Sequence, residues 1–353
     1  MSHDDFEESI EALFALQGLN ARVFVDSAMK EVSIAYDDIL PDDLAPMLIL
    51  DANGLQRKTY EYWQMHRKGI KFLPSREKSY KGFTVHHWNR GAGNDAYAEE
   101  NYRDLAAGVA KTIDSDVPKD EKVLVVHRLP NHFRVDMKDK ILGLLKSDPK
   151  RVSFTTWGQH TATNDFVDHK HVILVGTLNL PDAATEALGL SSKKQDVGVA
   201  LSKEEFYEIR RGELASDILQ AACRGSVRKV HGDTCPPGCH LYIIHSNKSA
   251  IDGESLFQRV FPGSSYEIWE PIIAPPSGKL QKAFVGAMLD LDRQPTGATI
   301  QIKSLLEKCE IQNRRDLIVI ADAVGPYLEA EYGIGPIIDA DTGKVGLKQF
   351  KPW

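Results

Sequence analysis

The pattern of hydrophobic and polar positions is most regular between residues 82 and 273, where short apolar runs alternate with longer amphipathic stretches. The apolar runs have the length of buried strands, and the stretches between them have the spacing of helices. This pattern predicts strands at 83–88, 122–127, 152–157, 171–176 and 240–246, and helices at 99–113, 137–145 and 203–223. Strands that alternate with helices form a parallel sheet with helices on its faces. We therefore expect an α/β fold with a doubly wound parallel sheet.

Before this region, the run from Ala45 to Leu50 is apolar at almost every position and ends in the polar turn Asp51-Ala52-Asn53-Gly54. Continuous apolarity predicts a strand that is buried on both faces of a sheet. Polar residues that follow such a strand are where α/β proteins place working side chains. Further upstream, the sequence predicts a helix at 6–16, a strand-like stretch at 22–36 and a turn at 40–43.

After residue 278 the pattern predicts a helix at 280–291, a second helix at 300–309 and a third helix capped by Asn313, with Arg314 and Arg315 in its first turn. Residues 335–350 predict a β-hairpin that turns at residues 341–343. Helix, turn, helix and hairpin in this order predict a small α+β winged-helix domain at 279–353. Such domains bind nucleic acids or proteins, and in larger enzymes they also act as structural braces.

Charge is distributed unevenly along the chain, whose net charge is −7. Residues 1–50 hold 11 acidic and 2 basic side chains, whereas the remainder holds 39 acidic and 41 basic ones. The stretch 56–81 is basic and interleaved with aromatic residues, a mixture suited to phosphate contacts and base stacking. Its candidate nucleic-acid contacts are Arg57, Lys58, Arg67 and Lys68. The alternative is a solvated amphipathic helix whose aromatic side chains lie in the core.

Length and composition narrow the class of protein. With 353 residues, the chain is expected to form two or three domains. It has no apolar run long enough to cross a bilayer and no basic-then-apolar leader, which predicts a cytosolic protein with no membrane partner. Four cysteines, two of them in helical patterns, do not predict a disulfide framework. A serine-hydrolase elbow of the form Gly-x-Ser-x-Gly is absent from the sequence.

The segment 217–232, DILQAACRGSVRKVHG, carries two arginines, Arg224 and Arg228, with no acidic residue between them. The nearest acids are Asp217 before Arg224 and Asp233 after Arg228. Arginines on a solvated helix usually have acidic partners three or four residues away. These two are therefore candidates for binding an anionic ligand, although basic side chains at a helix end also interact favourably with the helix dipole.

This segment resembles the arginine-bearing motif in the second RecA-like lobe of superfamily-two helicases of the DEAD/DEAH type, in forms typical of phages and plasmids. The motif reads Gln-x-x-Gly-Arg-x-x-Arg, and Gln220 and Arg224 match its spacing. Cys223 stands where the motif has glycine, and Arg228 lies one residue late. The resemblance extends over residues 45–250 through three further segments in the family's order: LILDANG, VLVVH and the stretch from Thr156 to Gly176.

The resemblance implies a role for each matching residue. Arg224 and then Arg228 would stabilise the γ-phosphate of ATP held by another lobe, and Gln220 would orient nucleotide or water. Asn164 and Asp165 would link nucleotide state to the nucleic acid, and Thr163 stands where the family has glycine. Asp51 and Asn53 would form the coupling turn. Further candidate nucleic-acid contacts are His127, Arg314 and Arg315.

The resemblance also implies a division of the chain. Residues 1–55 would be the tail of a first RecA-like lobe, 56–81 a basic connection, 82–273 the second RecA-like lobe and 279–353 the winged helix. A phosphate loop and a strand ending in Asp-Glu are missing from the sequence, so ATP and Mg²⁺ would be held mainly by a separate or truncated partner lobe. The expected partner is DNA or RNA. A second hypothesis is a non-catalytic DNA-binding adaptor, a RecA-like relic with a winged helix, in replication or in plasmid or phage maintenance.

A different chemistry is suggested by HGDTCPPGCH at residues 231–240, in which His231, Cys235, Cys239 and His240 have side chains that bind zinc. Two prolines between the cysteines and the adjacency of Cys239 and His240 do not fit a standard zinc knuckle. The sequence favours a plain loop here, and we expect no metal.

Overall fold

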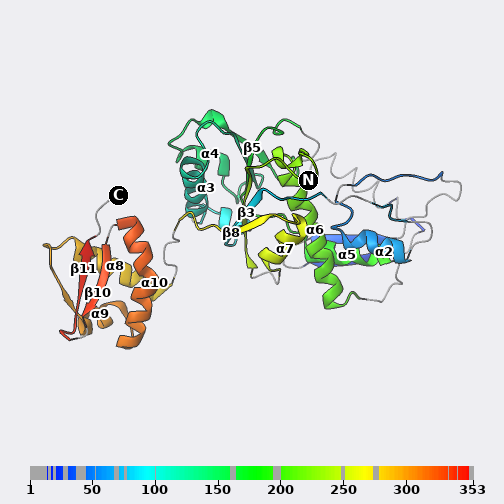
Figure 1. The fold of residues 1–353 in the computed structure, drawn as a ribbon. Coiled ribbons are helices and arrows are strands. Elements are labelled where there is room, and N and C mark those ends of the chain that lie inside the picture. Colours follow the sequence, from blue (N-terminus) through cyan, green and yellow to red (C-terminus); the bar gives the residue numbers. More distant parts are fainter. Residues whose placement is uncertain are drawn as a thin grey trace. The chain divides into compact units, whose positions relative to one another are not determined.

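The computed structural model describes residues 14, 17–18, 21–26, 31–36, 45–51, 53–66, 71–74, 78–99, 101–159, 164–193, 200–247, 251–272, 278–332, 334–339 and 341–349. Contacts within the chain divide it into two compact units, Met1–Trp269 and Glu270–Trp353 (Figure 1). Apart from Phe14, the helix expected at 6–16 lies outside the described residues, as do the turn expected at 40–43 and the candidates Arg67 and Lys68.

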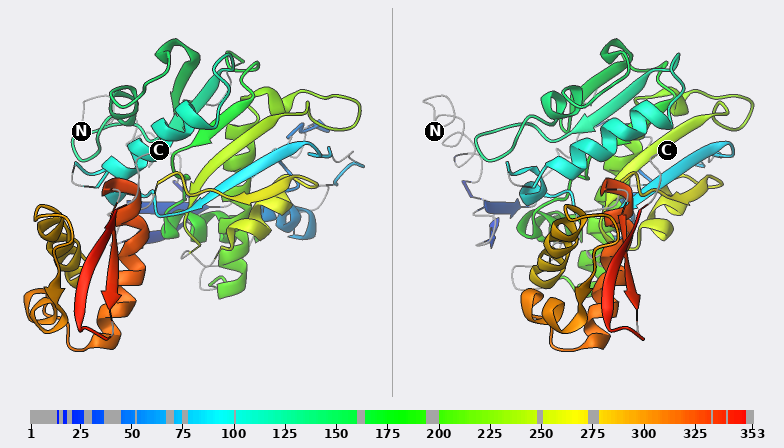
Figure 2. Two further views of the ribbon diagram at one scale, coloured as in Figure 1. Left: turned by 60° about the vertical axis from the view of Figure 1, so that its left-hand side comes forward. Right: turned by 90° about the vertical axis from the view of Figure 1, so that its left-hand side faces the viewer.

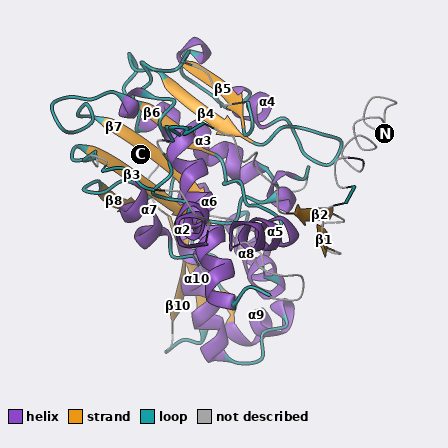
Figure 3. Ribbon diagram, turned by 90° about the vertical axis from the view of Figure 1, so that its right-hand side faces the viewer, coloured by secondary structure: helices purple, strands orange, loops and turns teal. Residues whose placement is uncertain are grey.

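Six parallel strands form the centre of the first unit. They are β3 (Phe83–Asn89), β4 (Val123–His127), β5 (Val152–Thr156), β6 (His171–Leu174), β7 (Cys239–His245) and β8 (Ser265–Ile268). Their order across the sheet is β5-β4-β6-β7-β3-β8 (Figure 3), and every neighbouring pair is parallel. This confirms the predicted α/β class with a parallel sheet, consistent with a RecA-like fold. The sequence pattern does not reveal β8, because this edge strand buries none of its four residues.

Helices connect these strands and cover both faces of the sheet. They are α3 (Arg103–Ser115), α4 (Met137–Leu142), α5 (Asp182–Lys193), α6 (Lys203–Ala222) and α7 (Gly253–Val260), with 3-10 turns at Asn94–Tyr97, Pro149–Arg151 and Ser226–Arg228. Helix α6 begins at a reciprocal cap, in which Ser202 Oγ accepts from the Glu205 amide and the Glu205 carboxylate accepts from the Ser202 amide. This cap fixes the start of the helix that carries the candidate arginines at its other end.

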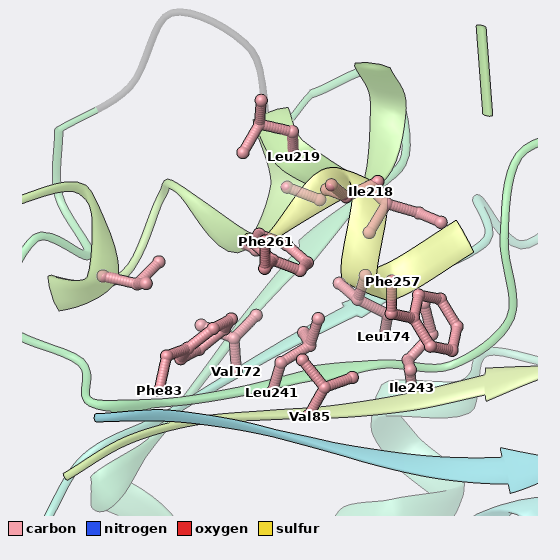
Figure 4. Close-up of a cluster of buried hydrophobic side chains, with 14 of the residues drawn as sticks. Phe83, Val85, Val172, Leu174, Ile218, Leu219, Leu241, Ile243, Phe257 and Phe261 are labelled. Carbon is pink, nitrogen blue, oxygen red and sulfur yellow. The ribbon is translucent and has the colours of Figure 1, made fainter. Parts of the chain in front are cut away.

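The main core lies between one face of the sheet and helices α6 and α7 (Figure 4). Alternate residues of a strand point to the same face, so Phe83 and Val85 of β3 both enter this core. They meet residues from β7, α6 and α7, namely Leu241, Ile243, Ile218, Leu219 and Phe257. On the opposite face, the Trp269 indole donates to the Thr112 hydroxyl of α3 at 3.0 Å. The core therefore holds the end of α6 in a fixed position against the sheet.

The apolar run at 45–50 does not form the predicted buried strand, so this prediction is wrong. Met47, Leu48, Ile49 and Leu50 lie in an irregular segment with exposed fractions of 66%, 68%, 65% and 88%. A strand that is apolar on both faces is stable only when other strands and helices cover it. Within the described part of this chain the run has no such cover, and its side chains face solvent.

A two-stranded antiparallel hairpin precedes this run, formed by β1 (Ala21–Asp26) and β2 (Glu31–Tyr36). Val23 pairs with Ile34 and Val25 with Val32. All four of these side chains lie on one face of the hairpin and are exposed. Residues 21–50 therefore present two apolar surfaces to solvent.

The second unit contains α8 (Lys279–Asp292), β9 (Ile300–Gln301), α9 (Ile302–Cys309), α10 (Arg314–Tyr332), β10 (Ile334–Asp339) and β11 (Lys344–Gln349). Its antiparallel sheet has the order β10-β11-β9, and β10 lies beside α10 (Figure 2). Asn313 caps α10 as expected, since its Oδ1 accepts from the Asp316 amide at 3.0 Å. The expected helix at 300–309 begins two residues later, because Ile300 and Gln301 pair with β11 instead.

All four cysteines of the chain, Cys223, Cys235, Cys239 and Cys309, are free thiols. Among the described residues, we find no helix that combines the length and the apolar character of a membrane span.

Candidate functional site at the end of helix α6

Arg224 lies just past the end of α6, in a turn that packs closely on the segment before β6. The amide of Ser226 donates to the carbonyl of His169 at 2.7 Å, and the Ser226 hydroxyl donates to the carbonyl of Val167 at 3.0 Å. A Cβ at Gly225 would lie 2.7 Å from the His169 carbonyl oxygen, so only glycine fits between these two stretches of backbone. The arginine-bearing turn is thus held at the edge of the sheet where the strands begin.

The packing brings together two predicted motifs that are separated by some sixty residues. The guanidinium of Arg228 donates to the Asn164 side-chain oxygen, and the ammonium of Lys229 lies 2.6 Å from Asp168. Asp165 lies in the same exposed turn as Asn164. Of the residues assigned to nucleotide contact, Arg224, Arg228, Asn164 and Asp165 therefore gather at one edge of the sheet.

Positive charge is concentrated at this edge. Burial lowers the pKa of Arg224, and the neighbouring charge of Arg228 lowers it further. Lys78 adds a third cation beneath the turn, where its ammonium donates to the carbonyls of Val227 and Lys229, each at 2.6 Å. The sequence counts Lys78 among the basic residues of 56–81 but contains no signal that places it here. Two guanidiniums and an ammonium close together favour an anion such as a phosphate.

The turn at Asp51–Gly54 packs against the middle of the same helix. The side-chain amide of Asn53 donates to the Ser216 hydroxyl at 3.3 Å and to the Ser216 carbonyl at 3.4 Å. Asp51 holds the turn together, because it accepts from the Asn53 amide at 2.8 Å and from the Tyr60 hydroxyl at 2.8 Å. One helix therefore carries the predicted coupling turn at its middle and the predicted arginine motif at its end, with half-buried Gln220 between them.

A close helix–loop contact fixes this arrangement. A Cβ at Gly212 of α6 would lie 2.7 Å from the Gln56 carbonyl oxygen, and Arg57 forms an ion pair with Glu213 at 3.3 Å. Asp217 lies one turn further along α6, with its carboxyl group half-buried. Burial raises its pKa to about 6, the charge of Glu213 raises it too, and Arg57 opposes the shift.

We expect Asp217→Asn to stabilise the chain at alkaline pH. Because the folded state raises the pKa of Asp217, the stabilising form is the protonated acid, and its contribution is lost as the pH rises through about 6. An asparagine is neutral throughout, so the substitution should raise the free energy of unfolding by about 2–3 kcal/mol near pH 8 and by little near pH 4. Urea unfolding at both pH values measures this, with Asp233→Asn as the exposed control. Equal effects at both pH values would contradict the expectation.

The remaining candidates have other surroundings, each described within its own unit. Lys58 forms an exposed ion pair with Glu61 at 2.6 Å within α2 (Lys58–His66), and Tyr62 of the same helix is buried. His127 is also buried, and its Nδ1 contacts the Arg128 carbonyl. Arg314 and Arg315 are exposed at the start of α10 in the second unit. Burial of Tyr62 agrees with the alternative in which the aromatic residues of 56–81 are core residues.

The Cys and His residues of 231–240 occupy separate environments. Cys235 and Cys239 are fully buried, whereas His231 is exposed. His240 lies in a row of stacked side chains across the sheet, with its ring 5.0 Å from that of His171 and its Nδ1 3.0 Å from Nε2 of His86. Among the described residues, no group of three or more His, Cys, Asp or Glu side chains is arranged to hold a metal ion.

Comparison with known proteins does not assign this chain to a family. No protein-family model matches the sequence, and no curated protein matches it. A solved structure named XPD_APO resembles this chain with a TM-score of 0.39 and 13% sequence identity, over 60% of this chain and 46% of that one. The chain thus spans less than half of that structure's length. The fold defines the first unit as an α/β protein built on a six-stranded parallel sheet.

Proposed function

We propose that this chain is the arginine-finger half of an ATP-dependent nucleic-acid helicase or translocase. The observation that carries the proposal is the convergence of Arg224 and Arg228 with Asn164 at the start of β6. A guanidinium keeps its charge at all physiological pH values and presents a planar fork to phosphate oxygens. In this role Arg224 stabilises the charge that develops on the γ-phosphate, and Arg228 with Asn164 senses the same nucleotide.

ATP and Mg²⁺ are held by a partner lobe in this proposal, because the sequence lacks a phosphate loop. The exposed apolar run Met47–Leu50 supports such a partner. Its four consecutive apolar side chains suit a strand inside a sheet that is covered on both faces. We assign this run to the sheet of the partner lobe, and the Asp51–Asn53 turn would then pass directly from that sheet to α6. Residues 1–55 become the tail of the first lobe.

For the second unit we propose a winged helix that contacts protein rather than the DNA major groove. Helix α10 would be its recognition helix, and its two arginines are outnumbered by four acidic residues, Asp316, Asp322, Glu329 and Glu331. Ile318 and Val319 are exposed on this helix, with exposed fractions of 42% and 61%. An acidic helix with exposed aliphatic side chains repels phosphate and suits a protein surface.

A mixing experiment tests the helicase proposal. The chain alone is expected to hydrolyse ATP at background rate. Addition of a RecA-like lobe that has a phosphate loop and an Asp-Glu strand, from the adjacent reading frame, should raise the rate at least about tenfold, since it completes the transition-state contacts. Ile49→Asp should prevent this gain, because a charge inside a covered sheet is strongly unfavourable. Hydrolysis that is unchanged by mixing, together with nucleic-acid binding indifferent to ATP, would favour the adaptor.

A further inference from the structure

The loop that follows β4 forms a rigid tip at the opposite edge of the sheet from Arg224. In its tight turn, the amide of Asn131 donates to the carbonyl of Arg134 at 3.2 Å, and the amide of Arg134 donates back at 3.1 Å. The Asn131 side chain also accepts from the Phe133 amide at 2.9 Å. At the base of the loop, the Val135 amide donates to the carbonyl of fully buried Tyr97 at 3.0 Å. The position of the tip is therefore fixed by hydrogen bonds.

This fixed tip presents an aromatic ring to solvent. Phe133 is 75% exposed, although most phenylalanine side chains are largely buried. Its ring centre lies 3.9 Å from that of His132, and Leu129 of the same loop is 53% exposed. A rigid backbone that holds a phenylalanine in water creates a surface on which a flat group can stack at little entropic cost.

Two arginines, Arg128 and Arg134, lie at the two ends of this loop and share one hydrogen-bond acceptor. Arg128 and Arg134 each donate through Nη1 to the side-chain oxygen of Asn94, at 3.4 and 3.3 Å. Arg128 also donates to the Thr177 carbonyl at 2.7 Å. Within the described ranges, neither guanidinium has a carboxylate within ion-pair distance. The nearby Asp136 carboxylate instead accepts from the Lys138 amide at the start of α4.

Placing two guanidiniums around one neutral oxygen is electrostatically unfavourable, because their like charges repel each other. Burial lowers the pKa of Arg128, and the charge of Arg134 lowers it further. An anion between the two guanidiniums would remove this repulsion and accept hydrogen bonds from both. In a single-stranded nucleic acid, each phosphodiester lies next to a nucleotide whose base is an aromatic ring. Such a strand therefore offers an anion for the two guanidiniums and, beside it, a flat ring for Phe133.

We propose that the loop 128–134 is a binding subsite for single-stranded nucleic acid, in which Arg128 and Arg134 hold one phosphate and Phe133 stacks on the adjacent base. The subsite is separate from the Arg224 site, because it follows the carboxyl end of β4 whereas Arg224 lies where β6 begins. It extends the proposed function by placing part of the nucleic-acid track, but binding at this loop requires neither ATP nor a partner lobe.

Fluorescence anisotropy of labelled oligo(dT) and oligo(U) with the full chain tests this proposal. Loss of one stacked base is expected to weaken binding by about 5- to 100-fold in Phe133→Ala, whereas Phe133→Trp should bind at least as well as the wild type. Phe133→Leu separates stacking from apolar contact, since it keeps apolar bulk without the aromatic face. Residue 133 is exposed, so all three variants should fold.

The salt dependence of binding reports separately on the arginines. Each phosphate contact to a single strand contributes about 0.7 to the slope of log affinity against log salt, so Arg134→Gln should reduce the slope by about that amount. Phe133→Ala should leave the slope unchanged. Arg210→Gln is the matched control, because Arg210 pairs with Asp182 on the surface and lies outside the loop. Comparison of the two oligonucleotides shows whether DNA or RNA is preferred.

Wild-type affinity in Phe133→Ala, or full affinity in Phe133→Leu, would overturn the stacking proposal. A wild-type chain that binds neither oligonucleotide at low salt would overturn it too. These outcomes are distinct from failure of the arginine-finger proposal, because the binding assay contains no nucleotide and no partner lobe.

Discussion

Arg224→Ala is expected to reduce ATP hydrolysis by the reconstituted pair of lobes by about 10³-fold or more, the effect of removing an arginine finger. The guanidinium acts on charge that appears only in the transition state, so kcat should fall while the affinity for ATP changes little. Arg224→Lys should recover only a small part of the activity, since an ammonium keeps the charge but loses the planar fork. Steady-state kinetics with saturating nucleic acid measure these rates.

Two further variants sharpen this experiment. Arg228→Ala should cost less than Arg224→Ala, because Arg224 matches the spacing of the motif whereas Arg228 lies one residue late. Arg210→Ala, on the same helix, removes an exposed pair with Asp182 that contributes at most about 1 kcal/mol to stability, and it should leave the rate unchanged. A rate in Arg224→Ala within a few-fold of the wild type would exclude a finger at this position and leave the adaptor hypothesis.

The departures of this chain from the helicase motif have a local structural explanation. The motif places glycine before the first arginine, whereas here Gly225 follows Arg224 and makes the close approach to the His169 carbonyl. The additional residue before Arg228 is taken up by the 3-10 turn Ser226–Arg228, which returns the second guanidinium to Asn164. Neither adjustment can be read from spacing alone, because both depend on backbone that lies more than fifty residues away.

The sequence predicted the helices and strands that are determined by residues close together in the chain. Strands β4 and β6 are apolar at every position except His127 and His171, helix α6 has a capping box, and α10 has its Asn313 cap, so each could be recognised from a few neighbouring residues. The short strand at Ile300 was missed because its reason for extending is a pairing with Val345, far along the chain. The sequence counted Lys78 only among the basic residues of 56–81 for the same reason, since the carbonyls it binds belong to Val227 and Lys229.

The run Met47–Leu50 was predicted to form part of a buried strand, and the reason why this prediction is wrong is informative. Its pattern indicates a strand that is covered on both faces, but the described part of this chain supplies no cover. A sequence pattern states what environment a segment requires, and it does not state which polypeptide provides that environment. For the same reason the loop 128–134 carried no signal in the sequence, because its two arginines become a pair only through Asn94.

Gly176→Ala is expected to lower the free energy of unfolding of the first unit by about 3–5 kcal/mol, because two costs add. Gly176 ends the segment after β6 with a φ of +83°, in the left-handed region that disfavours a Cβ. A Cβ there would also lie 2.5 Å from the Ala92 carbonyl oxygen and 2.9 Å from the Ala92 Cβ. Since backbone cannot move aside as a flexible side chain can, the contact is expected to displace the whole Ala92 loop.

Gly158→Ala is the control that separates these two costs. Gly158 has a φ of +92° but nothing within 4 Å of a Cβ, so the substitution should cost only the strain, about 1–2 kcal/mol. Urea unfolding followed by tryptophan fluorescence measures both variants in the first unit, because four of the five tryptophans precede residue 270. Equal losses would show that the Ala92 contact relaxes freely. A larger loss in Gly176→Ala should also weaken oligonucleotide binding, because the Ala92 carbonyl accepts a hydrogen bond from Nε of Arg128.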